Sequence, residues 1–205
     1  MPRNKDDYAN IQKQRKSALL DSSLRLFALF GYDSISIDDI TKDAKCSHGL
    51  FYHYFNSKED LLLQLISKNK DDWENSAKSI DFTQKPKFVL REIIDFHLSK
   101  LNASDKSAYA AFFFLTTYFQ KKLPEPLLSK KQKKEHLFPK ILELIKRGQE
   151  DGDFEKGEPR DYALVLLACL RGLAYARIHL GPKEFTTPKP EVLMNLFIRK
   201  DTPHA

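Results

Sequence analysis

The stretch SIDDITKDAKCSHGLFYHYFNSKEDL, residues 36–61, decides how the chain is interpreted. Ser36 is followed three residues later by Asp39, and this pair predicts a capping box at the start of a helix. Apolar residues then recur at helical spacing as far as Ala44. A second cap candidate, Ser47, comes only three residues later, so two short helices must be joined by a tight turn. This spacing predicts a helix-turn-helix motif.

The second helix of the motif has two different sides. A rotation of about 100° per residue places Phe51 and Phe55 on one side and Gly49, Tyr52 and His53 on the opposite side. The aromatic side is expected to pack inward, which leaves the other side free to face a partner.

A third cap pair, Ser57 and Asp60, predicts the start of the next helix. Lys58 stands in its first turn, where free backbone N–H groups make a natural seat for a phosphate. The apolar pattern continues to about Ala77, which is long enough to join two domains. A shift at the far end of such a helix would tilt the motif at its near end.

The residue types and spacing of residues 31–61 resemble those of the TetR family of bacterial transcriptional regulators. The matching segments are Gly31-Tyr32, Ser36–Ile40, Ala44, Ser47–Gly49, Phe51–Phe55 and Ser57–Leu61. They lie in about the first third of the chain. The resemblance implies an all-α fold, with an N-terminal three-helix helix-turn-helix DNA-binding domain at residues 1–56. A C-terminal helical ligand-binding and dimerisation domain would occupy residues 57–205.

The same resemblance implies a homodimer that binds a two-fold-symmetric, double-stranded DNA operator. A small-molecule effector in the C-terminal domain would release the DNA, which is the behaviour of a repressor. The aromatic residues predicted on the helix at residues 104–121 indicate that this effector is largely apolar. Two alternatives stay open: a transcriptional activator, and a dimeric ligand-binding or interaction module without a specific operator.

Position by position, the resemblance assigns DNA contacts to Ser36, Ser47, His48, Gly49, Leu50, Tyr52, His53 and Lys58. Two residues depart from the family pattern. Lys45 replaces the usual turn glycine, which implies either a positive φ costing roughly 1 kcal/mol or a slightly different turn. Leu50 replaces a small or polar residue, which suggests an apolar contact, such as one with a thymine methyl group, in place of a hydrogen bond to a base.

Composition limits the other function classes. The net charge of +6 over 205 residues permits nucleic-acid binding, but acidic residues nearly match the basic ones through residue 70, so the DNA interpretation depends on the motif. The two cysteines, Cys46 and Cys169, are too far apart in sequence for a metal cluster. We therefore expect no metal and no cofactor. Without a membrane-length apolar run or a signal peptide, we expect a cytoplasmic protein with no membrane partner.

An enzyme is the main rival class. The chain contains no HExxH, no GxGxxG, no phosphate-binding glycine loop and no nucleophile elbow. A nucleophile pair would need Cys46 or Cys169 beside a histidine such as His97 or His179. A cysteine in mid-helix beside a leucine-rich stripe favours packing, so we expect no enzymatic activity.

Two helices predicted at residues 86–101 and 104–121 carry the candidate effector site. His97 is a polar residue on the apolar stripe of the first, and the second contains the aromatic run AYAAFFFLTTYF. Core packing and ligand contact are both open for each of these residues. The candidate ligand contacts are His97, Tyr109, Phe113 and Tyr118.

Two helices predicted at residues 159–180 and about 188–200 carry the candidate dimer interface. In the first, Ala168, Gly172 and Ala176 recur every four residues and permit close helix approach. A four-helix bundle across a two-fold axis would bury both helices, whereas packing within one subunit is the alternative. The candidate interface residues are Leu164, Ala168, Gly172, Tyr175, Ala176, Val192, Leu193, Leu196 and Phe197.

Overall fold

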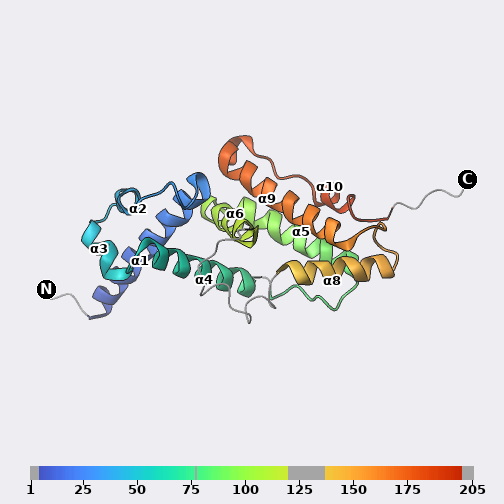
Figure 1. Cartoon of the computed structure of the whole chain (residues 1–205), viewed down its shortest axis with the longest axis horizontal. Coiled ribbons are helices and arrows are strands. Elements are labelled where there is room, and N and C mark those ends of the chain that lie inside the picture. The colour runs from blue at the N-terminus through green and yellow to red at the C-terminus, as the bar shows by residue number, and fades with distance from the viewer. Residues whose placement is uncertain (1–4, 77, 120–136, 200–205) are drawn as a thin grey trace, which may run out of the picture. The chain divides into compact units, whose positions relative to one another are not determined.

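The computed structural model describes residues 5–76, 78–119 and 137–199 of the chain. Every regular element within these ranges is a helix, apart from one isolated β-bridge, so the expected all-α fold is confirmed (Figure 1). The chain divides into two compact units, Met1–Asp71 and Asp72–Ala205. Helix α4, Lys58–Ser76, continues across the point of division.

The first unit contains α1 (Lys5–Phe30), α2 (Ile37–Asp43), α3 (His48–Tyr54) and most of α4 (Figure 1). Its core is built from apolar side chains of all four helices. The largest of these are no more than 1% exposed: Leu19, Ile40, Phe51, Phe55 and Leu61. Burying the aromatic side of α3 in this core leaves the opposite side at the surface.

The predicted caps start these short helices. The Ser36 hydroxyl accepts a hydrogen bond from the Asp39 N–H, and the Asp39 carboxylate accepts one from the Ser36 N–H, which completes the capping box. Ser57 caps α4 by accepting from the Asp60 N–H. The Asp60 carboxylate binds the Asn56 N–H. Such caps are worth about 1 kcal/mol each, which matters for helices of seven residues.

The second unit is a bundle arranged around α5 (Pro86–Ala103). Helix α5 contacts α6 (Asp105–Phe119), α8 (Leu137–Glu150), α9 (Pro159–Glu184) and α10 (Pro190–Met194) (Figure 1). Because α5 has neighbours on several sides, its apolar stripe from Val89 to Leu101 is fully enclosed.

The C-terminal segment differs from the helix expected at about residues 188–200. Helix α10 ends at Met194, so the expected length is wrong. Phe197, which is completely buried, anchors the turns that follow, and Ile198 pairs with Phe154 in the isolated bridge. The Glu155 N–H donates to the Phe197 carbonyl across this pairing. These interactions replace the helical hydrogen bonds that an amphipathic pattern alone would predict.

Helix α9 is long and apolar enough to pass as a membrane span by length and composition. That is weak evidence, because core helices pass the same test. Arg177 on α9 is 6% exposed and donates to the Leu101 carbonyl and the Asp105 carboxylate, both at the corner between α5 and α6. These bonds place this side of α9 in the interior of the helical bundle.

Candidate nucleic-acid interface

The turn between α2 and α3 is held by a defined set of backbone hydrogen bonds. Lys45 has a positive φ of 52°. A positive φ is the first of the two alternatives expected where lysine replaces the usual turn glycine. The Lys45 N–H donates to the Lys42 carbonyl, and the Cys46 N–H donates to the Thr41 carbonyl. This is a Schellman motif, in which the left-handed residue satisfies the last carbonyls of α2. It reverses the chain so that α3 begins at once.

The exposed side of α3 is the candidate DNA-reading face. His48, Gly49, Tyr52 and His53 are exposed, and Leu50 is partly buried. Tyr52, at 52% exposure, is a large aromatic ring at the surface. Beneath it lie Phe51 and Phe55 of the core. A short helix with a buried aromatic back and a polar aromatic front fits the dimensions of the major groove of B-DNA.

The two cap serines differ in what they can offer to DNA. The Ser36 hydroxyl donates its single hydrogen to the Asp39 carboxylate, so that hydrogen is not available to a phosphate. The Ser47 hydroxyl accepts a hydrogen bond from the Leu50 N–H and keeps its own hydrogen as a donor. Bonds from Ser36 hold the pKa of the Asp39 carboxyl below its usual value, so a negative charge stays at the start of α2.

Lys58 makes contacts inside the unit that the sequence did not reveal. Its Nζ donates to the carbonyl oxygens of Tyr32, at 3.0 Å, and Ile35, at 2.8 Å. The same Nζ lies 4.1 Å from the centroid of the Tyr32 ring. An ammonium has three N–H donors, so only one remains for a phosphate. In this structure, Lys58 joins the first turn of α4 to the loop between α1 and α2.

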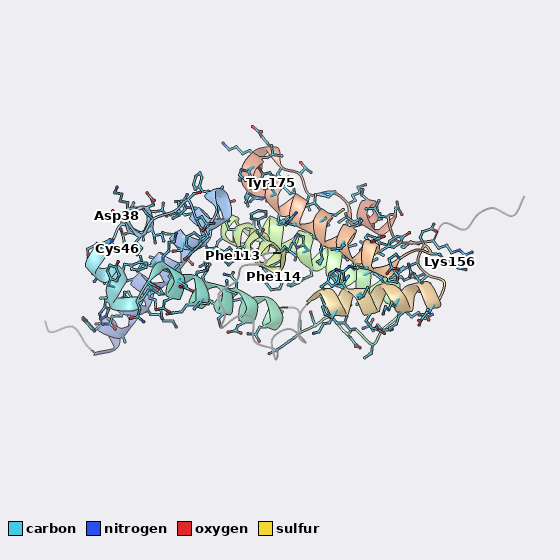
Figure 2. All side chains as sticks on the ribbon, in the orientation of Figure 1. Asp38, Cys46, Phe113, Phe114, Lys156 and Tyr175 are labelled. Atoms are coloured by element: carbon cyan, nitrogen blue, oxygen red, sulfur yellow. The ribbon has the colours of Figure 1, made fainter. Side chains whose placement is uncertain are left out.

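Contacts between helices were missed by sequence reasoning. Asp38 of α2 places Oδ1 3.2 Å from Nε2 of His48 at the start of α3, and Figure 2 labels Asp38 at the surface of this unit. Arg25 of α1 forms an ion pair with Asp43 of α2. Neither pair has a signal in the sequence, because the partners lie on different helices and no fixed spacing relates them.

Comparison with known proteins agrees with this geometry. Residues 19–65 match the model of the bacterial regulatory proteins, tetR family, and this match spans α2, α3 and the start of α4. The uncharacterized HTH-type transcriptional regulator YuxN of Bacillus subtilis (strain 168) is 44% identical over 55 residues, 27% of this chain and 19% of that protein. Residues 19–65 belong to the TetR family.

The similarity of fold extends well beyond the matched residues. The structure of AibR in complex with isovaleryl coenzyme A and operator DNA covers 88% of this chain and 94% of its own, with a TM-score of 0.61 and 16% identity. FadR from Bacillus subtilis in complex with stearoyl-CoA covers 88% and 96%, with a TM-score of 0.60 and 19% identity. At these identities the likeness concerns the fold alone. In sequence, the chain spans between 19% and 50% of the length of the first curated relatives that it matches.

The candidate effector residues lie on α5 and α6. His97 is 1% exposed, and its Nε2 lies 2.9 Å from the Leu170 carbonyl oxygen of α9. Because a carbonyl only accepts, Nε2 carries the hydrogen. Burial lowers the His97 pKa to about 4, so the ring is neutral at pH 7. Phe113 is buried on α6 (Figure 2), Tyr109 is partly exposed, and the side chain of Tyr118 lies outside the described residues.

The candidate dimer residues fall into two groups. Leu193 and Phe197 are 6% and 0% exposed and belong to the core of the subunit. Ala176 is partly buried. The remaining candidate residues lie at the surface. The four largest of them are between 37% and 59% exposed: Leu164, Tyr175, Val192 and Leu196. This exposed stripe consists of Leu164, Ala168, Gly172 and Tyr175 on α9, with Val192 and Leu196 at and just after α10.

Proposed function

We propose that this chain is a sequence-specific transcriptional regulator that inserts α3 into the major groove of an operator. The exposed side of α3 carries the proposal. It presents His48, Tyr52 and His53 outward, while a Schellman turn and the buried Phe51 fix the helix against α2. A rigid support of this kind is what base reading requires, because hydrogen bonds to base edges depend on precise placement.

We further propose that the regulator binds as a homodimer through the exposed stripe on α9 and α10. Four large apolar side chains in one stripe, with Ala168 and Gly172 between them, suit close packing against a second copy of the chain. A two-fold dimer would present two copies of α3 to half-sites about 34 Å apart, or a multiple of that distance, in successive major grooves.

A binding selection from random double-stranded DNA tests the function. The expected result is a two-fold-symmetric consensus, bound with an affinity that falls steeply as salt concentration rises. His53→Ala, which changes an exposed side chain on α3, is expected to relax the consensus at one position in each half-site. Failure of the parent protein to enrich any sequence would contradict the proposal and favour a dimeric module without an operator.

We propose that a largely apolar small molecule in the second unit releases the DNA, as a repressor requires. The solved complexes of AibR and FadR contain acyl coenzyme A thioesters, which combine an apolar chain with a polar part. Helix α6 carries two apolar side chains, Phe113 and Phe114, that are buried within the second unit. Helix α4 continues from one unit into the other and is the proposed route of coupling.

The effector proposal requires a coupling free energy of about 1–3 kcal/mol between the two sites. Operator affinity is measured across a panel of fatty acids, acyl coenzyme A thioesters and apolar alcohols, with Phe113→Ala as the comparison variant. A weakening of operator affinity by about 5- to 150-fold is expected for one class of compound. No shift by any compound would contradict the effector proposal, and increased transcription from a reporter on protein binding would favour an activator.

A further inference from the structure

A carboxylate–imidazole contact on the DNA-reading side links the two helices of the motif. Oδ1 of Asp38 lies 3.2 Å from Nε2 of His48, and the two side chains are 69% and 52% exposed. The ring of His48 also stands edge-on to the ring of Tyr52, with centroids 5.3 Å apart and an interplanar angle of 78°. His48 is therefore held from α2 by Asp38 and supported along α3 by Tyr52.

The pair is not needed for the fold. Both side chains are exposed, and an exposed ion pair contributes little to stability because water screens it and two side chains must be ordered. The helix cap next to it uses a different carboxylate, that of Asp39. A negative charge at Asp38 suits the positive end of α2, in whose first turn it stands, but it is unfavourable for a surface that approaches phosphates.

We propose that Asp38 determines the sequence preference of the motif by fixing the ring of His48, an inference that rests on the proposed operator binding. The Asp38 carboxylate lies beside Nε2, so the Nδ1 side of the ring faces away from α2. An imidazole nitrogen held at the surface of α3 can form a hydrogen bond with the edge of a base in the major groove.

The charge of Asp38 has a separate effect, on affinity for DNA of any sequence. Lys42 in the last turn of α2 and Lys45 in the turn are exposed and attract phosphates of any sequence. The Asp38 carboxylate opposes that attraction. It therefore lowers affinity for all DNA alike, which leaves the ratio of specific to non-specific affinity unchanged. Its hold on His48 favours the correct base and is the effect that raises this ratio.

The test compares the parent with Asp38→Ala, His48→Ala and the double variant, at one pH and one salt concentration. Asp33→Ala serves as a matched control, because it removes an exposed carboxylate from the loop that precedes α2. Each protein is used in a selection from random DNA. Affinities are then measured for the parent's selected duplex and for a scrambled duplex.

Asp38→Ala is expected to bind the scrambled duplex more tightly and to lower the specific-to-non-specific ratio by about tenfold. It should relax the consensus at the same base position as His48→Ala. The double variant should show no further relaxation, since the two residues act as one unit. Asp33→Ala should keep the parent's consensus.

Two results would overturn the inference. The first is an Asp38→Ala protein that keeps the parent's consensus and affinity ratio. The second is a double variant whose loss in affinity ratio equals the sum of the losses in the two single variants. Thermal unfolding of each variant shows whether the fold is kept, and His48→Gln provides a second substitution if His48→Ala unfolds. If the parent itself selects no consensus, the proposed operator binding fails, which is a different outcome from a parent that selects a consensus unaffected by Asp38.

Discussion

Lys58 is the residue whose surroundings differ most from expectation, because its place in the first turn of α4 suggested a phosphate contact. Its ammonium binds two carbonyl oxygens of the loop between α1 and α2, so Lys58→Met removes these bonds and keeps most of the apolar stem. We expect the free energy of unfolding to fall by about 1–2 kcal/mol. The salt dependence of operator binding should stay unchanged. Urea unfolding and DNA titrations at several salt concentrations measure the two quantities.

Lys42→Met is the matched control for Lys58→Met, because Lys42 is an exposed lysine on α2. Its stability should stay within about 0.5 kcal/mol of the parent's value. If Lys58→Met keeps the parent's stability but loses about one unit of salt slope, Lys58 is a phosphate contact, as the family resemblance implies.

His97 leads to a prediction about pH. Its pKa is about 4 in the folded protein and 6.5 in the unfolded chain. Between these values the unfolded chain binds a proton that the folded protein does not, so the free energy of unfolding falls as pH falls. The loss amounts to about 3 kcal/mol from pH 6.5 to pH 4. Urea unfolding at steps of pH, compared with His97→Gln, measures it.

The glutamine variant keeps a donor for the Leu170 carbonyl but does not titrate in this range. It should therefore lose less stability on acidification than the parent, because the remaining carboxyl groups are common to both proteins. Equal losses in the two proteins would mean that His97 is not the group responsible.

Sequence reasoning at the residue scale succeeded where a rule relates neighbours. Ser36 and Asp39 are three residues apart, so their cap could be predicted. Lys45 replaces a turn glycine, which limited its backbone to two alternatives, and its positive φ is one of them. The contacts of Lys58 with Tyr32 and of Asp38 with His48 could not be predicted. They join separate elements, and periodicity within one element holds no information about them.

At the scale of elements, α9 offers a direct test of the dimer. A Cβ atom built at Gly172 meets nothing within 4 Å in the subunit, so Gly172→Leu should leave the subunit folded. The larger side chain would overfill the close approach of two α9 helices. We expect a shift from dimer to monomer in sedimentation experiments, with an unchanged circular dichroism spectrum.

Glu143→Leu on α8 is the control for Gly172→Leu, because it adds the same side chain at an exposed position outside the stripe. It should leave the sedimentation coefficient unchanged. A dimeric Gly172→Leu protein would place the interface on another surface.

Apolar periodicity predicted where these helices lie but not all of their ends. The stripe over residues 188–200 has helical spacing, yet α10 ends at Met194 because Phe197 is drawn into the core and Ile198 pairs with Phe154. For the same reason, two of the predicted interface residues, Leu193 and Phe197, face inward. Periodicity identifies a buried face without saying whether the same subunit or a second copy covers it.

At the scale of the whole molecule, the proposed dimer and the proposed operator binding are linked through the number of phosphates contacted. The logarithm of affinity falls with the logarithm of salt concentration, with a slope of about −0.9 for each phosphate neutralised. A dimer engages two half-sites and a monomer engages one. Gly172→Leu should therefore bind with about half the parent's salt slope.

The measurement uses fluorescence anisotropy with two labelled duplexes, one carrying both half-sites of the selected operator and one carrying a single half-site. The parent should prefer the duplex with both half-sites strongly, because binding one half-site brings the second α3 to its own half-site at high effective concentration. The monomeric variant should bind a half-site with similar affinity in both duplexes. If a variant that is monomeric by sedimentation keeps the parent's slope and preference, the second copy of α3 makes no contact with DNA, and the two-fold arrangement is wrong.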